Sequence, residues 1–174
     1  RPLATAVTVA LSLGTTGLTV AQEPSPATEA ATPAATATAP KAKDFRPGFD
    51  DLMTMLVQPR HLKLHYAAAQ LNWELAAAES RNLRQSFDRI SQALPRYLGI
   101  DVATAVSAMM VPQLQNVDAA IAAADPARFR AAYDGLTKAC NACHVYMERP
   151  YITVKVPDDA APSAYPGQDF TAAQ

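Results

Sequence analysis

Residues 125–150 read DPARFRAAYDGLTKACNACHVYMERP, and this stretch predicts one long helix. Asp125 followed by Pro126 is typical of a helix start, because the carboxylate caps free backbone N–H groups and proline fits the first helical turn. Apolar residues then follow at steps of three and four, the spacing of one helix face, with His144 next to the last of them: Phe129, Tyr133, Leu136, Cys140 and Cys143. Pro150 ends the helix, since proline cannot continue it.

Residues 140–144 of this predicted helix are Cys-Asn-Ala-Cys-His, the C-x-x-C-H pattern of covalent haem attachment. Positions three apart share one helix face, so the thiols of Cys140 and Cys143 can reach both vinyl groups of one haem. His144 lies one turn beyond Cys140 and can offer a ring nitrogen to the iron. A thioredoxin-like redox pair would need a strand-to-helix context, and a zinc site would need further ligands. The motif therefore predicts one haem c, with Cys140 and Cys143 as thioethers and His144 as axial ligand.

The composition of the whole chain narrows the fold class. Of 174 residues, 37 are alanine, and alanine favours helices over strands, which argues against an all-β domain. The net charge of −1 gives no electrostatic footprint for a nucleic acid or an anionic membrane surface. The two cysteines are too close in sequence to staple a chain of this length, so a disulfide scaffold is excluded.

Three further helices are predicted before the motif helix, at about 47–70, 73–93 and 101–124. Pro59 predicts a kink, or a break and restart, near Gln58, and Pro112 predicts a second kink. Helices of about 20 residues joined by short connections are antiparallel neighbours. The sequence therefore predicts an all-α fold, an antiparallel four-helix bundle.

The remaining segments are predicted to serve export and tethering. Residues 1–21 have a positive start, an apolar stretch and a small-residue cleavage site, as in a signal peptide, with a retained membrane anchor as the alternative. Residues 22–43, rich in Ala, Thr and Pro, predict a disordered linker. The folded domain is expected over 44–157. Within it, 151–156 alternates like a strand without a partner and is expected to lie extended on the bundle, followed by a loose tail over 158–174.

A signal peptide, four helices and C-x-x-C-H in the last helix together resemble the class II c-type cytochromes, the cytochrome c-prime and c-556 group. The resemblance covers roughly residues 48–150 as an architecture. In typical members a basic residue follows the haem histidine by four positions, whereas here Glu148 stands there and Arg149 follows. The resemblance implies a four-helix bundle with one covalently bound haem.

The sixth position of the iron decides what such a haem does. In the c-556 type a methionine near the start of the first helix resembles Met53 in position, and thioether ligation suits an electron carrier. His61 is the alternative sixth ligand, about 80° from Met53 around an ideal helix. Met53 is equally interpretable as core filling, and His61 as a polar residue bonded to solvent or to a haem propionate.

These residues predict an exported, periplasmic mono-haem cytochrome that carries single electrons between transient redox partner proteins. The alternatives are a five-coordinate haem protein that binds NO or CO on an open face lined by Leu52 or Leu56, and a haem subunit of a membrane-anchored complex. No catalytic constellation is present, so no enzyme is expected. A membrane is a partner only if the N-terminal segment is retained, a nucleic acid is not expected, and a homodimer is left open.

Overall fold

The computed structural model describes residues 46–158 and 165–171, and this part of the chain is mostly helical, as the all-α prediction requires. The predicted signal peptide (1–21) and linker (22–43) lie outside the described residues. Strand structure within the described ranges is confined to β1 (Arg96–Tyr97) and β2 (Ile100–Asp101), a two-residue antiparallel pair. None of the helices in these ranges combines the length and the hydropathy that a membrane span needs.

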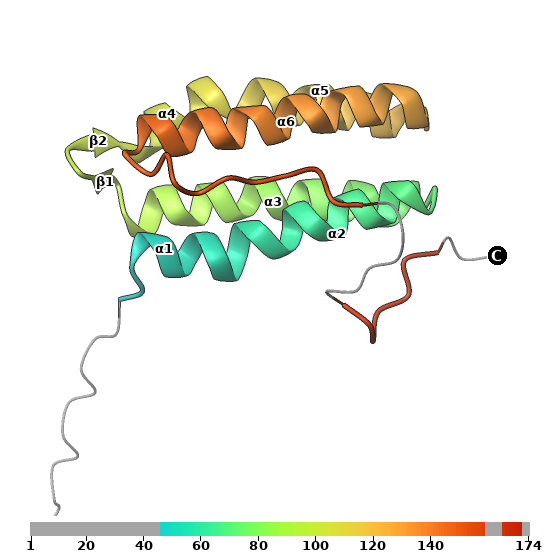
Figure 1. Ribbon diagram of the computed structural model, residues 1–174, viewed down its shortest axis with the longest axis horizontal. Coiled ribbons are helices and arrows are strands. Elements are labelled where there is room, and N and C mark those ends of the chain that lie inside the picture. The colour runs from blue at the N-terminus through green and yellow to red at the C-terminus, as the bar shows by residue number, and fades with distance from the viewer. Residues whose placement is uncertain (1–45, 159–164, 172–174) are drawn as a thin grey trace, which may run out of the picture. The chain divides into compact units, whose positions relative to one another are not determined.

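The helices lie side by side in two layers (Figure 1). The first rod is a continuous run of α1 (Phe49–Leu52), the π-helical segment η1 (Met53–Val57) and α2 (Gln58–Ala69). It shares one layer with the second rod, α3 (Trp73–Ala93), and the other layer holds α4 (Val102–Met109), α5 (Val111–Ala122) and α6 (Pro126–Tyr146). Helix α2 packs on α3, α5 on α6, and α3 on α5 across the layers.

Helix starts are fixed by the capping residues. The Asn72 Oδ1 atom accepts a hydrogen bond from the backbone N–H of Leu75 at 3.0 Å, and Asp101 caps α4 through Thr104 at 2.8 Å. Asp125 accepts from two N–H groups at the start of α6, at 2.9 and 3.0 Å. These caps satisfy donors that the first helical turn leaves unpaired, and the three helix starts predicted after Asn72, Asp101 and Asp125 are confirmed.

The two prolines act differently from one another. Near Pro112 the third predicted helix divides into α4 and α5 at Met110, two residues before the proline. Near Pro59 the rod does not stop; instead η1 forms directly before it, and the N–H of Gln58 bonds the carbonyl of Met53, five residues back. A π-helical turn holds one extra residue, which rotates the preceding residues by about 100°. The angle between Met53 and His61 thus changes from about 80° to about 20°, so both face one side.

The core fills the space between the layers with aliphatic and small side chains. Alanines at closely packed positions of α2 and α3, Ala67 and Ala76, are fully buried and let these helices approach. Several of its larger members are at most 1% exposed: Leu64, Leu83, Ile90, Met110, Leu114, Val117, Tyr133 and Leu136. This core sits beside the site described below and holds its helices in place.

Two extended segments follow α6. Residues 151–158 run beside α6, between the two layers of helices in Figure 1, and the sequence predicted an extended segment over 151–156. The expectation of a loose tail over 158–174 is wrong for residues 165–171. Phe170 is 2% exposed and packs edge-on against Tyr66 at 5.6 Å, and the carbonyl of Thr171 accepts a hydrogen bond from Asn72 at 2.7 Å. Burial of one aromatic ring holds this stretch on the helices.

Candidate functional site

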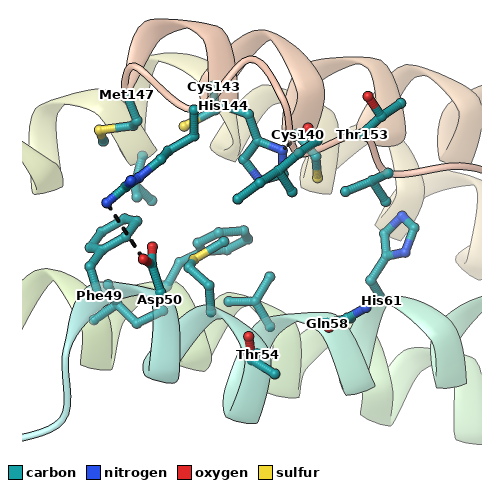
Figure 2. Close-up of a pocket in the computed structure, with 18 of the residues that line it drawn as sticks. Phe49, Asp50, Thr54, Gln58, His61, Cys140, Cys143, His144, Met147 and Thr153 are labelled. Carbon is teal, nitrogen blue, oxygen red and sulfur yellow. Dashed lines mark hydrogen bonds and ion pairs between the residues drawn. The ribbon is translucent and has the colours of Figure 1, made fainter.

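A cavity of about 410 Å³ lies between α6 and the first helical rod (Figure 2). Cofactor and ligand sites commonly have volumes of roughly 300–1,000 Å³. In Figure 2, Cys140, Cys143 and His144 lie on one side of the cavity, and Thr54 and Gln58 lie on the opposite helix. The cavity wall includes all five residues that the sequence singled out: Cys140, Cys143, His144, Met53 and His61.

The rest of the wall is largely apolar. Helices α3 and α4 contribute Phe87, Ile90, Val102 and Val106, and residues 152–155 of the extended segment close one side. Leu52 and Leu56, which the sequence suggested for an open face, are not among the lining residues and pack in the core instead. An apolar wall with a few polar groups suits a mostly apolar ligand.

Burial disfavours the thiolate form of both cysteines. Both cysteines are free, and burial raises the pKa of Cys140 to about 12 and also raises the pKa of Cys143. A redox-active cysteine pair depends on a lowered thiol pKa, which is the opposite arrangement. Among the described residues no group of three or more His, Cys, Asp or Glu side chains is placed to hold a metal ion, so a zinc site lacks its further ligands there. The raised thiol pKa values therefore argue against a redox-active cysteine pair.

The ring of His144 is oriented by the backbone. Its Nδ1 atom lies 2.9 Å from the carbonyl oxygen of Ile152. A carbonyl only accepts hydrogen bonds, so Nδ1 carries the proton and Nε2 carries the lone pair. Imidazoles that bind metals are usually held in this way by a second group, which fixes the tautomer and the ring direction. The lone pair on Nε2 of His144 can therefore bind a metal ion.

His61 has a different environment. Its Nε2 lies 3.0 Å from Thr137 Oγ1, its Nδ1 lies 2.9 Å from the hydroxyl of Tyr133, and the ring stacks on Tyr133 at 4.6 Å. Burial, and to a smaller extent His65, lower the pKa of His61 to about 4, so the ring is neutral at pH 7. Metal ligation by His61 would cost one of these hydrogen bonds. The arrangement favours Met53, whose side chain lines the cavity from η1.

The pKa of His61 leads to a stability prediction. Its folded value of about 4 lies below the ordinary 6.5, so between these pH values the unfolded chain binds a proton that the folded protein does not. The free energy of unfolding should therefore fall as the pH drops from about 6.5 to 4, by up to about 3 kcal/mol from this residue. Urea unfolding of wild type and His61→Gln across this range checks it. The variant should be less stable at pH 7 but show a flatter pH dependence, and parallel curves would contradict the assignment.

Two lining residues of the α6 terminus were missed by the sequence reasoning. Met147 is 2% exposed and continues the helix face of the motif, three positions after His144, a spacing that was readable. Arg149 donates hydrogen bonds to the hydroxyls of Tyr97 and Tyr151 and lies 3.5 Å from Asp50. Its buried Nε has no hydrogen-bond partner. The contacts of Arg149 with Tyr97 and Asp50 join distant segments, so no local pattern reveals them.

The side chains present fit a covalently bound haem. Two protonated thiols and an oriented imidazole share one wall, and the donor set adds the thioether of Met53. Arg149 and Lys155 also line the cavity and supply positive charge for the carboxylate groups of a haem. The Nε atom of Arg149 has no hydrogen-bond partner. In comparisons with known proteins, no family model, no curated protein and no solved structure matches this chain. The case for haem therefore rests on the motif and the cavity.

Proposed function

We propose that this protein is a haem-binding antiparallel four-helix bundle of the c-type cytochrome class. More particularly, it is a periplasmic mono-haem cytochrome that carries single electrons between redox partner proteins. The observation that carries the proposal is that one cavity collects Cys140, Cys143, His144 and Met53 from opposite sides. Two cysteines that can attach the ring, with an imidazole and a methionine thioether that can ligate the iron, are what an electron-transferring haem c requires.

Each of the candidate site residues has a defined role in this proposal. Cys140 and Cys143 would hold the ring by thioether bonds, and His144 would bind the iron through Nε2. Met53 would be the second protein ligand, with His61 as the alternative. Bound haem supplies a one-electron iron couple, and thioether ligation raises its reduction potential. The apolar wall from α3 and α4 would limit the access of water to the bound ring.

The alternative is a five-coordinate haem protein that binds NO or CO, and the difference lies in the sixth position. The experiment that tests the proposal is expression with a cytochrome c maturation system, followed by absorption spectra of the reduced protein with and without CO. At neutral pH the Soret band should change little after mixing. A rapid, large Soret change would overturn the electron carrier in favour of the gas-binding protein.

Met53→Ala tests the sixth ligand directly. Loss of the thioether should open the iron, so that CO produces a rapid Soret shift, and the reduction potential should fall below that of wild type. Stopped-flow spectroscopy with CO and a redox titration measure these effects. Met55→Ala is the matched control, because Met55 lies two residues away and is 65% exposed. If Met53→Ala behaves like Met55→Ala in both measurements, Met53 is not the ligand.

A further inference from the structure

The extended segment after α6 is fastened by a side chain inside the haem motif. The Nδ2 of Asn141 donates to the carbonyl of Val154 at 2.9 Å, and its Oδ1 accepts from the N–H of the same residue at 2.7 Å. Asn141 therefore engages both backbone groups of Val154. A side-chain amide is suited to this, because it offers one donor and one acceptor in the same plane.

The same segment supplies the partner of His144. The carbonyl of Ile152, two residues before Val154, accepts the hydrogen bond from Nδ1 at 2.9 Å. Asn141 and His144 are three positions apart and so share one face of α6, against which the segment lies. On its N-terminal side Ile152 is held by a backbone hydrogen bond to Arg149 at 3.1 Å. On its C-terminal side, the nearest hydrogen bonds are the two between Asn141 and Val154.

We propose that Asn141 is a positioning residue for the axial histidine. By holding Val154, it keeps the Ile152 carbonyl against Nδ1 of His144 and so sets both the tautomer and the donor strength of the imidazole toward the haem iron. The inference rests on the proposed function for its meaning. It concerns hydrogen bonds within the chain, however, so part of it is testable without haem.

The chemical reason is the effect of the carbonyl on the ring. A hydrogen bond from Nδ1–H to an acceptor shifts electron density to Nε2 and makes it a stronger ligand. A stronger donor stabilises the ferric over the ferrous iron and lowers the reduction potential. Release of the segment should therefore weaken the donor and raise the potential. Wild-type protein, with the segment held, is expected to have the lower value.

The first measurement uses the full chain without haem. Nitrogen-15 NMR of the imidazole should show the Nδ1–H tautomer of His144 in wild type and a shift toward Nε2–H in Asn141→Ala. Asn141→Asp keeps the acceptor for Val154 N–H and loses the donor, so its tautomer ratio should lie between the two. Ala142→Ser is the control at the neighbouring, exposed position of the motif. A tautomer ratio unchanged in Asn141→Ala and Asn141→Asp would overturn the inference.

The second measurement uses the haem-loaded protein in the Met53→Ala background, where the reduced iron is expected to be five-coordinate. The iron–histidine stretching band in resonance Raman spectra should move to lower frequency in Asn141→Ala, less so in Asn141→Asp, and not in Ala142→Ser. The reduction potential should rise in the same order. An unchanged band and potential, with only a lower melting temperature, would make Asn141 a structural fastener and overturn the proposal. Failure of wild type to attach haem would instead overturn the proposed function.

Discussion

Replacing both Cys140 and Cys143 with alanine is expected to abolish covalent haem attachment completely. These are the only two cysteines of the chain, and a thioether to a haem vinyl group requires a cysteine thiol. Both thiols line the same cavity, so they are placed to bind the same ring. Mass spectrometry of denatured protein, after expression with the maturation system, should show the mass of one haem on wild type and none on the double variant.

Single variants and a control sharpen this experiment. Cys140→Ala and Cys143→Ala should each retain at most one thioether, at lower yield than wild type. Ala142→Ser lies between them on the exposed side of α6 and should attach haem as wild type does. Haem that survives denaturation in the double variant would contradict the assignment. The absence of haem from wild type under the same conditions would contradict the proposed function as a whole.

Leu136→Ala is expected to lower the free energy of unfolding by about 2–5 kcal/mol. Leu136 has no exposed surface and lies on α6, one turn before Cys140, in contact with the main core. Truncation removes buried methyl groups and leaves a hole between packed helices, and both effects destabilise the folded state. Urea denaturation followed by circular dichroism at pH 7 measures the change.

The matched control for this variant is on the same helix. Val145 is 63% exposed, so Val145→Ala removes little buried surface and should change the free energy of unfolding by no more than about 0.5 kcal/mol. The comparison separates core packing from helix propensity, because both variants place alanine in α6. If the two variants lose equal stability, the core does not lie where the structure has it.

The helices were predictable because their signals are local. Asn72, Asp101 and Asp125 each cap an N–H group two or three residues further along the chain, and these contacts depend on little else. The division of the third helix near Pro112 follows from the missing N–H of one residue. The π-helical turn before Pro59 was not predictable in the same way, because proline permits a kink, a break or an extra residue in the turn.

For the candidate site, the residues could be predicted from the sequence, but the contacts around them could not. The spacing of Cys140, Cys143 and His144 alone places them on one helix face. It does not indicate that the carbonyl of Ile152 lies against His144, or that Asn141 binds Val154. The segment over 151–156 was recognisable as extended. Its position between the two layers of helices exists only once these layers have packed.

By itself the sequence determined the helical class, the helix starts and the motif whose thiols and imidazole share one face. The tertiary structure alone decided the side to which Met53 turns, the neutral state of His61, and the burial of Phe170. The physical reason is the separation of the partners along the chain. His61 and Thr137 are 76 positions apart in the sequence, and Asn72 and Thr171 are 99 positions apart, yet each pair is joined by a hydrogen bond. Contacts of this kind form only when the helices pack, and no local pattern encodes them.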